Sequence, residues 1–258
     1  MESRALGEIR AVVSRRMEAD GFLVAFTERS GGVSAEPFAS LNLGLRSGDD
    51  PGDVVQNRQR VADGFGGNRF ACVRQVHGSR VVRAGTSRAG AGFDDPATAL
   101  GDADAITTTT AGLPVAVLAA DCVPVALADP RSGRFAVVHA GWKGVAAGVI
   151  GAALEHFAEP SDVRAAIGPA ICVDHYEVGE DVAFSVSAAI DGGAVTKRDG
   201  GALHLDLPAS IARALKAAGV DSPERAEECT AHLPQRFFSH RRDGERTGRQ
   251  ALVAMRMG

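Results

Sequence analysis

Two apolar runs in residues 101–149 constrain the fold of this chain more than any other feature. Residues 113–128 and 134–139 are rich in Val, Leu and Ala, and each run predicts a strand buried on both faces. The connecting residues 129–133 include the Asp, Pro, Ser and Gly that are typical of turns. A glycine-rich stretch around Trp142 then predicts the start of an amphipathic helix. This unit predicts the centre of a mixed α/β domain.

Polar residues are rare in these two runs, and their positions indicate a site. Asp121 and Cys122 interrupt the first run, and His139 ends the second. A thiol and an imidazole that meet in space form either a pair of metal ligands or a nucleophile with its base. Burial as a small hydrophobe is the ordinary alternative for a free cysteine, and a structural role is the ordinary alternative for a histidine.

Composition limits the classes of protein to consider. The chain has 258 residues, 45% of them hydrophobic, and a net charge of −4, which argues against a basic nucleic-acid-binding protein. Its four cysteines are widely spaced without a Cys-x-x-Cys pair, so neither a zinc finger nor a disulfide framework is predicted. The first 20 residues lack the apolar core of a signal peptide, and Asp121 and two prolines break the longest apolar run. We therefore expect a cytoplasmic protein, monomeric, with no membrane or nucleic-acid partner.

The remaining residues predict alternating strands and helices. Residues 1–20 are expected to form an N-terminal arm or a short charged helix, residues 21–258 one catalytic domain, and residues 85–99 an inserted loop. Further strands are predicted at 22–26, 72–82, 163–167, 203–207, 225–230 and 250–255, and helices at 53–65, 144–157, 176–190 and 209–218.

Three residues form the candidate metal set: His77, Cys122 and His139. Three protein ligands with one open position are typical of catalytic zinc, which lowers the pKa of bound water to roughly 7. The same residues also allow a metal-free site with Cys122 as nucleophile, His139 as base and His77 or Asp121 as the orienting group. The three residues are far apart in sequence, so both alternatives stay open here.

Cationic and aromatic residues predict an anion and a planar base as ligands. The candidates for the anion are Arg29, Arg58, Lys143, Arg241 and Arg242, with Lys143 favoured because it follows His139 at a glycine-rich helix start. Trp142, with Phe237 or Phe238, is a candidate for stacking on a base, although core packing is more common for aromatic residues.

Ordered sequence blocks across residues 22–256 resemble the purine nucleoside phosphorylase family that was formerly labelled polyphenol oxidase or laccase domain. The blocks are FTERSGGVS, SLNLG, RQVHG, DADAITT, ADCVPVALAD, VVHAGWKG, IGPAICVDHYEVGEDV, HLDL and FFSHRRDGERTGRQA. The older copper-oxidase label agrees poorly with this chain, which has seven histidines and no His-x-His pair.

The resemblance implies a fold, a cofactor and two activities. The fold is a single-domain α/β (α+β) sandwich of mixed sheets flanked by helices, and the cofactor is a zinc ion on His77, Cys122 and His139. The activities are phosphorolysis of adenosine, inosine, guanosine and methylthioadenosine, and deamination of adenosine. On this basis we expect phosphate at Arg29, Lys143 and Arg58, with Asn42 as a further substrate-binding residue. Asp121 is expected to be an acid/base group or to orient a histidine.

Two rival functions stay open at this point. One is a metal-free cysteine hydrolase that uses Cys122 and His139, and the other is a binding protein that retains an inactive pocket. The blocks around Cys172 and Cys229 differ from those common in the family, and the sequence assigns no role to these thiols.

Overall fold

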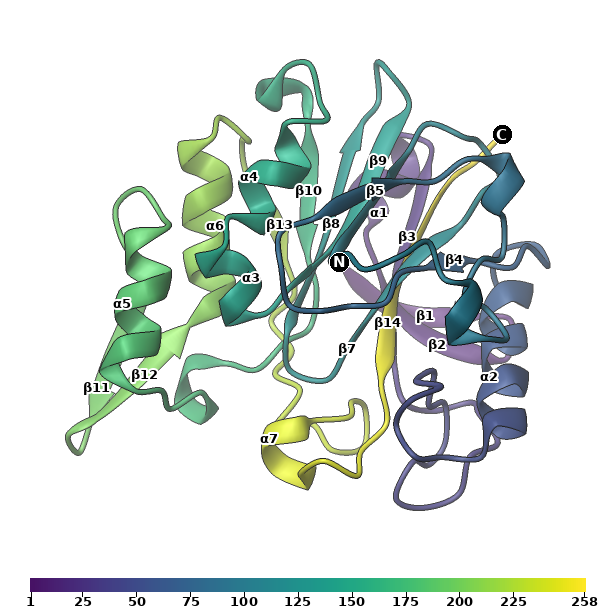
Figure 1. Ribbon diagram of the computed structural model, residues 1–258, viewed down its shortest axis with the longest axis horizontal. Coiled ribbons are helices and arrows are strands. Elements are labelled where there is room, and N and C mark those ends of the chain that lie inside the picture. The colour runs from purple at the N-terminus through teal and green to yellow at the C-terminus, as the bar shows by residue number, and fades with distance from the viewer.

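Two six-stranded β-sheets lie face to face in the computed structural model, which describes residues 1–258 (Figure 1). The first sheet has the order β1 (Glu2–Leu6), β2 (Ile9–Val13), β3 (Phe22–Thr27), β14 (Gln250–Arg256), β7 (Val115–Ala119) and β4 (Ala71–Cys72). The second has the order β13 (Glu224–Arg225), β10 (Arg164–Ile167), β8 (Val123–Asp129), β9 (Arg134–Ala140), β6 (Ala105–Thr108) and β5 (Val81–Arg83). The pairs β4–β7, β10–β13 and β5–β6 are parallel and the others antiparallel. The predicted mixed sandwich is confirmed.

Helices cover the outer face of each sheet, which gives four layers. The α2 helix (Pro51–Asp63) packs on the first sheet, at the right of Figure 1. The second sheet is covered by α3 (Trp142–Ala146), α4 (Val149–Leu154), α5 (Glu180–Ala188) and α6 (Leu207–Ala217), with the hairpin β11 (Val195–Asp199) and β12 (Ala202–Asp206) beyond them. The short helices α1 (Arg15–Ala19) and α7 (His240–Asp243) complete the α-helical set, and 3-10 turns occur at Thr86–Arg88, Pro96–Thr98, Pro160–Asp162 and Val173–His175. None of these helices combines the length and the apolar character needed to cross a membrane.

Successive side chains of a strand point to opposite faces of its sheet, and this alternation explains the layers. In β8, Val125 and Leu127 pack toward the helices, whereas Ala126 faces the core between the two sheets. That inner core contains Phe26 from the first sheet and Phe135 from the second, both fully buried. Since both faces of each central strand are covered, these strands are apolar throughout.

The long apolar run at residues 113–128 is two strands rather than the one predicted. β7 belongs to the first sheet and β8 to the second, and the chain crosses between the sheets at residues 120–122. Asp121 has a φ of 92° at this crossing, a backbone conformation that non-glycine residues rarely adopt. Both strands are buried on both faces, so only the polar pair Asp121 and Cys122 marks the break.

The N-terminal segment also differs from expectation. Residues 1–20 form the hairpin β1–β2 followed by the five-residue α1 helix, instead of an arm or a single short charged helix. The charged residues of the edge strand β1, Glu2 and Arg4, are half-buried and pair with Arg15 and Glu18, while β2 buries Ile9 and Val13. Because charged residues are spread along the segment, the sequence pattern did not indicate the edge strand β1.

Three further predicted elements are shorter or broken. The strand expected at 72–82 is a loop between β4 and β5, and the strand expected at 225–230 is limited to β13. The helix expected at 144–157 is divided into α3 and α4 by Gly148, whose φ is 84°. The other predicted strands and helices correspond to observed elements with small shifts at their ends.

Candidate active site

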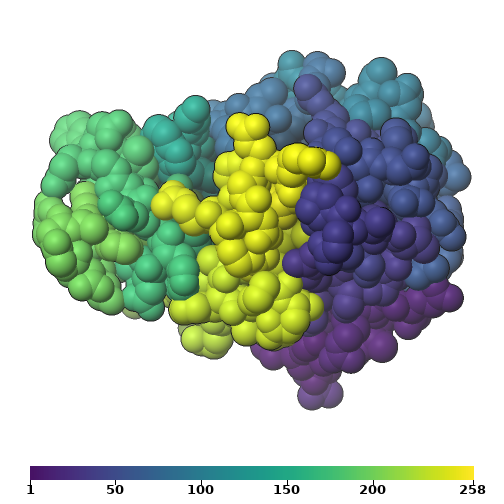
Figure 2. Space-filling view, turned by 90° about the horizontal axis from the view of Figure 1, so that it is seen from below, coloured from purple at the N-terminus to yellow at the C-terminus, as the bar shows by residue number.

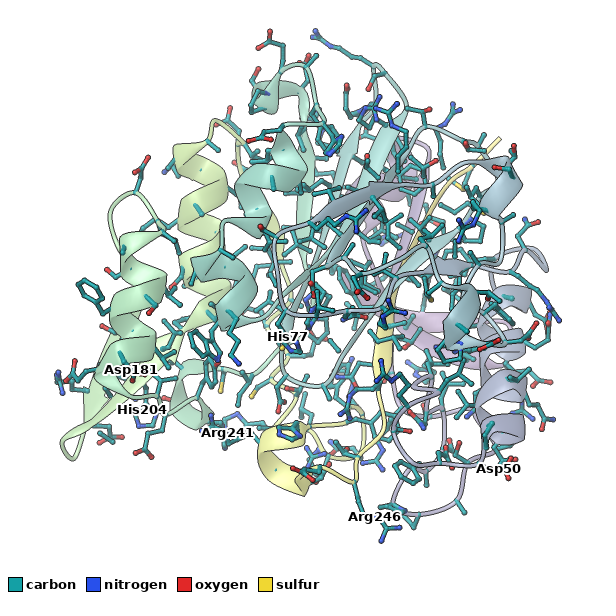
Figure 3. The ribbon with its side chains drawn as sticks, in the orientation of Figure 1. Asp50, His77, Asp181, His204, Arg241 and Arg246 are labelled. Carbon is teal, nitrogen blue, oxygen red and sulfur yellow. The ribbon has the colours of Figure 1, made fainter.

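The ligand atoms of His77, Cys122 and His139 all lie within 4.8 Å of one another. His139 is in β9, Cys122 directly precedes β8, and His77 is in the loop between β4 and β5, near the centre of Figure 3. The antiparallel register pairs Pro124 with His139, which places Cys122 at the end of the same sheet. The structure therefore brings together the three residues of the predicted metal set.

Asp104, which the sequence did not single out, holds two of these three residues in place. Its carboxylate accepts a 2.9 Å hydrogen bond from Nδ1 of His139. It also accepts the backbone N–H groups of Val76, His77 and Gly78 at 3.2, 2.9 and 2.7 Å. Asp104 is fully buried, and a carboxylate on the second nitrogen of a histidine fixes the ring for metal binding. The available signal was an acidic residue directly before an apolar strand, in the block DADAITT.

Electrostatics favour a thiolate at Cys122. Burial acts to raise the pKa of this thiol, but the charges and hydrogen bonds of His139 and His77 outweigh burial and lower the pKa to about 6. Burial acts to lower the pKa of His139, but Cys122 and Asp104 raise it to about 9. Each shift depends on the charge of the other group, so together they describe a thiolate–imidazolium pair in the metal-free protein.

The donor set fits a zinc ion. Thiolate and imidazole are the ligands that zinc prefers, and Asp104 supplies the outer carboxylate that ligand histidines usually contact. Gly141 provides the space: a Cβ atom there would lie 3.0 Å from Sγ of Cys122 and 3.1 Å from Cδ2 of His77. His77 has a φ of 60°, so the loop is held in an uncommon conformation at the site.

A cavity of about 790 Å³ opens over these residues, within the range of small-molecule sites. Its walls include residues 44–47, 72–77 and 118–122, His139 with Gly141, Trp142 and Lys143, and a C-terminal part with His240, Arg241 and Arg249. Figure 2 shows this C-terminal segment, in yellow, between the blue-purple N-terminal half and the green segments that include α5 and α6. Trp142 and Tyr176 supply aromatic walls.

Of the predicted anion-binding residues, Lys143 lies exposed in the cavity wall with its ammonium 5.6 Å from the Trp142 ring. Arg58 also reaches the cavity, but its buried guanidinium donates to the carbonyl groups of Leu43, Gly92 and Phe93. Through these hydrogen bonds Arg58 joins the loop at Leu43 to the loop at Gly92 and Phe93. Phosphate binding by Arg58 stays a prediction.

Two other predicted ligands lie outside the cavity wall. Arg29 donates to the carbonyl groups of Ala39 and Pro234 and stacks on Phe238, 4.5 Å from its centroid. Asn42 is fully buried, and its side-chain oxygen accepts the N–H of Arg249 at 2.8 Å. Tertiary contacts occupy the polar groups of both residues, and their roles as substrate ligands stay predictions.

Asp121 and the two C-terminal phenylalanines also differ from expectation. The carboxylate of Asp121 accepts hydrogen bonds from Oγ1 of Thr230 at 2.6 Å and from the N–H of Arg241 at 2.7 Å. It braces the C-terminal segment, while Asp104 orients His139. Phe237 and Phe238 are fully buried in the core and cannot stack on a ligand.

Two further arginines line the cavity: Arg241, which was one of the anion candidates, and Arg249, which the sequence did not single out. Arg249 is half-buried, and burial lowers its pKa while Cys122 and Asp121 act in the opposite direction, which places its charge near the metal set. Arg241 lies at α7, below His77 in Figure 3, with its guanidinium 5.2 Å from the Tyr176 ring. Arg249 had no distinguishing sequence signal among the many arginines of the C-terminal block.

The fold and the site together define a candidate metalloenzyme on a four-layer α/β sandwich. The family model described as "Multi-copper polyphenol oxidoreductase laccase" matches residues 23–257, and the chain belongs to this family. The family predicted from the sequence blocks is thus confirmed.

Relatives in this family are named purine nucleoside phosphorylase. The one from Deinococcus radiodurans is 42% identical over 235 residues, which cover 89% of this chain and 87% of the relative. The one from Mycobacterium tuberculosis strain H37Rv is 44% identical over 234 residues, which cover 88% of this chain and 89% of the relative.

Solved structures share the whole fold. YlmD from Geobacillus stearothermophilus superposes with a TM-score of 0.87 at 37% identity, covering 92% of this chain and 93% of that one. The Bacillus licheniformis hypothetical protein YfiH gives a TM-score of 0.86 at 30% identity, covering 98% of each chain.

Proposed function

We propose that this protein is a zinc-dependent purine nucleoside phosphorylase that also deaminates adenosine. The observation that carries the proposal is the His77–Cys122–His139 group at a cavity whose wall presents Lys143 and Arg249. The names of the relatives support phosphorolysis as the main reaction. We propose adenosine, inosine, guanosine and methylthioadenosine as the substrates, and a monomer in the cytoplasm as the working form.

Different cavity residues bind the phosphate and the purine base during phosphorolysis. An oxygen of phosphate bonds to C1′ of the sugar while the bond from C1′ to the purine nitrogen breaks, and the base leaves with the bonding electrons and takes up a proton. Lys143 and Arg249 neutralise and orient the phosphate, because cations pair with phosphate through charge-assisted hydrogen bonds. Trp142 and Tyr176 present aromatic faces on which a purine can stack.

The metal site is proposed for zinc rather than for copper redox chemistry. A blue-copper centre adds a weak axial ligand, usually Met, to two His and one Cys, and no methionine lines the cavity. When bound, zinc supplies Lewis acidity to a substrate oxygen or nitrogen atom and makes coordinated water more acidic. Asp104 keeps the proton on Nδ1 of His139, so that Nε2 of this ring is free to bind the ion.

Product analysis tests the proposed function directly. Purified, zinc-loaded protein is incubated with adenosine, with and without phosphate, and the products are separated by chromatography. We expect adenine and ribose 1-phosphate only when phosphate is present, and inosine in both cases. An enzyme that leaves adenosine, inosine and methylthioadenosine unchanged would contradict the proposal.

A cysteine hydrolase is the second candidate, and one observation favours it. Cys122, His139 and Asp104 are arranged as nucleophile, base and orienting carboxylate, with the thiol pKa lowered to about 6. A chelator separates the two candidates. Loss of activity with EDTA and its recovery with zinc support the phosphorylase, whereas full activity of the metal-free protein supports the hydrolase.

A further inference from the structure

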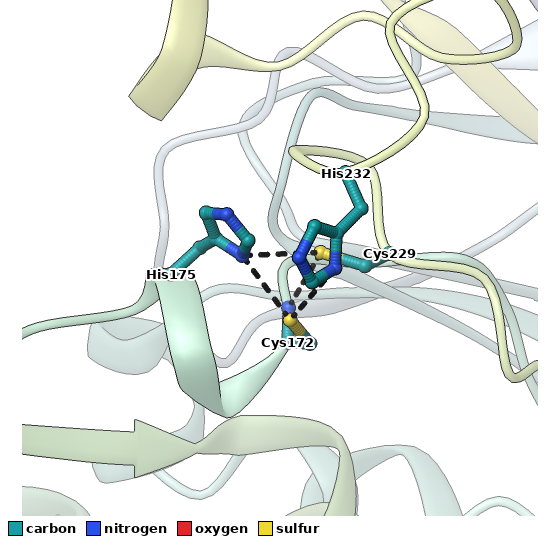
Figure 4. A group of neighbouring side chains, drawn as sticks. All are labelled: Cys172, His175, Cys229 and His232. Carbon is teal, nitrogen blue, oxygen red and sulfur yellow. Dashed lines mark hydrogen bonds between the residues drawn. The ribbon is translucent and has the colours of Figure 1, made fainter. Parts of the chain in front are cut away.

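A second group of thiols and imidazoles lies beside the cavity and takes no part in the proposed reaction. It consists of Cys172, His175, Cys229 and His232, whose ligand atoms are all within 4.8 Å of one another (Figure 4). The residues come from two Cys-x-x-His segments that are far apart in sequence. One segment follows β10 and contains the 3-10 turn Val173–His175, and the other lies in the C-terminal part of the chain.

The separations within this group match those of a tetrahedral zinc site. Sγ of Cys172 is 3.4 Å from Nδ1 of His175 and 3.8 Å from Nδ1 of His232, and Sγ of Cys229 is 4.0 Å from Nδ1 of His175. Bond lengths of about 2.3 Å to sulfur and 2.0–2.1 Å to nitrogen place tetrahedral ligand atoms roughly 3.3–3.8 Å apart. These three separations need a contraction of at most a few tenths of an ångström, and the other pairs, which lie within 4.8 Å, need at most about 1–1.5 Å.

Backbone contacts hold the two segments in this arrangement. A parallel bridge pairs Ala170 with Cys229, and the N–H of Thr230 donates to the carbonyl of Ala170 at 3.0 Å. The N–H of Cys172 donates to Sγ of Cys229 at 3.2 Å. Cys229 is buried and His232 is exposed. The group is therefore anchored in the protein interior at Cys229 and open to solvent at His232, where an ion can enter.

We propose that Cys172, His175, Cys229 and His232 bind a structural zinc ion. Two thiolates and two imidazoles fill a tetrahedral shell, which is the closed arrangement of structural zinc sites and leaves no position for substrate. The ion joins two segments that both support the cavity. Tyr176, directly after His175, lines the cavity, and Thr230, directly after Cys229, donates to Asp121. This second zinc ion therefore stabilises the cavity wall without taking part in the chemistry.

Metal content tests the proposal in a protein whose first site is removed. In the His77→Ala/Cys122→Ala variant we expect one zinc ion per chain by inductively coupled plasma mass spectrometry. Cobalt in place of zinc should give the visible bands of a tetrahedral ion and thiolate-to-metal charge transfer. Zinc at roughly a hundred times its dissociation constant should raise the midpoint of thermal unfolding by about 5–10 °C.

Ligand variants in the same background complete the test. Adding Cys172→Ala and His232→Ala should reduce zinc from one ion per chain to none, and His232→Ala alone, at an exposed position, should weaken zinc binding at least about tenfold. The control variant His156→Ala changes a histidine outside both groups and should keep one zinc ion.

Two results would overturn the proposal. One is a first-site-deleted protein that binds no zinc or cobalt when the metal is supplied. The other is the loss of two titratable thiols with no metal present, which would indicate a disulfide between Cys172 and Cys229. Activity is not a readout in either experiment, so failure of the proposed phosphorylase function leaves this test unchanged.

Discussion

At the scale of single residues, Asp104 organises the candidate active site. Its buried carboxylate contacts the ring of His139 on one side and the backbone of His77 on the other. Hydrogen bonds and the charge of His139, together with the N–H groups of Gly78 and His77, lower the pKa of Asp104 although burial acts to raise it. The carboxylate is therefore ionised at neutral pH and holds both ligands in position.

Replacement of Asp104 by Asn should weaken metal binding. The amide N–H₂ group cannot accept all of the hydrogen bonds that the carboxylate accepts, so His77 and His139 lose their fixed geometry. Replacing a residue that hydrogen-bonds to a metal ligand typically lowers metal affinity by about 10–100-fold. A zinc competition titration measures this loss. The exposed residue Asp102, which pairs with Arg74, gives a matched control. Equal zinc affinity in Asp104→Asn and Asp102→Asn would contradict the positioning role.

Cys122 should react as a thiolate in the metal-free protein. Since its pKa is lowered to about 6, the rate of alkylation by iodoacetamide should rise with pH through about 6 and then level off. Burial raises the pKa of Cys72, and burial with Cys229 raises that of Cys172 to about 11, so these thiols should react slowly at pH 7. Peptide mapping by mass spectrometry identifies the alkylated residue. Zinc should protect Cys122, and a profile centred near 8.5 would refute the lowered pKa.

Lys143 should determine the affinity for phosphate. Charge-assisted hydrogen bonds contribute about 1.5–3 kcal/mol, so Lys143→Ala should raise the KM for phosphate by about 10–100-fold. Lys216, exposed on α6, is a matched control whose replacement by Ala should leave the KM unchanged. Steady-state kinetics at varied phosphate concentration measure both variants. An unchanged dependence on phosphate in Lys143→Ala would exclude this role.

At the scale of elements, the site is built where strands end. β7 and β8 belong to different sheets, and the crossing between them places Cys122 at the edge of the sandwich. β9 ends one residue after His139, and Gly141 then starts α3. The loop before β5 adds His77, so three separate connections converge on one point.

The start of α3 should tolerate no side chain at Gly141. A Cβ atom would approach Cys122 and His77 to about 3 Å, so Gly141→Ala should displace a ligand and lower zinc affinity by roughly tenfold. Gly151 in α4 has no neighbour within 4 Å of such a Cβ atom, and Gly151→Ala should bind zinc normally. Zinc titration with circular dichroism checks binding and folding together. Normal binding by Gly141→Ala would show that the ligands can move aside.

At the scale of the whole molecule, a partly buried ion pair joins the two ends of the chain. Glu28 follows β3 and accepts two hydrogen bonds from Arg236, at 2.7 and 3.1 Å, and one from Ser3 of β1. Burial acts to raise the pKa of Glu28, but Arg236 and Ser3 outweigh burial and lower it. The N-terminal hairpin, the first sheet and the C-terminal segment therefore share one electrostatic contact.

Stability should depend on pH through Glu28. A lowered pKa in the folded state stabilises the protein above the unfolded value of about 4.3, and this contribution disappears as the pH falls below it. Glu28→Gln should reduce the free energy of unfolding by about 1–3 kcal/mol at pH 7, with a smaller difference from the wild type near pH 3. Urea unfolding at several pH values measures this difference. Glu8→Gln, at an exposed pair, should show little change; a Glu28 effect independent of pH would refute the argument.

Much of the secondary structure is predictable from local sequence. The α2 helix illustrates the reason: Asp50 caps its first N–H groups, Pro51 occupies its first turn, and its buried residues recur at helical spacing. Strands such as β3, β9 and β14 are similarly marked by apolar runs between turn residues. Edge strands that contain charged residues, such as β1, carry no such signal.

The sequence by itself determined the apolar strands, the helix starts and the residue types of the metal set, because these follow from short-range periodicity and from ligand chemistry. Only the tertiary structure decided that residues 113–128 divide between two sheets, that Asp104 orients His139, and that Arg58 and Arg29 are committed to carbonyl groups. It also brought Cys172 and Cys229 together. Strand pairing and hydrogen bonding join residues that are far apart in the chain, and no local pattern in one sequence specifies those partners.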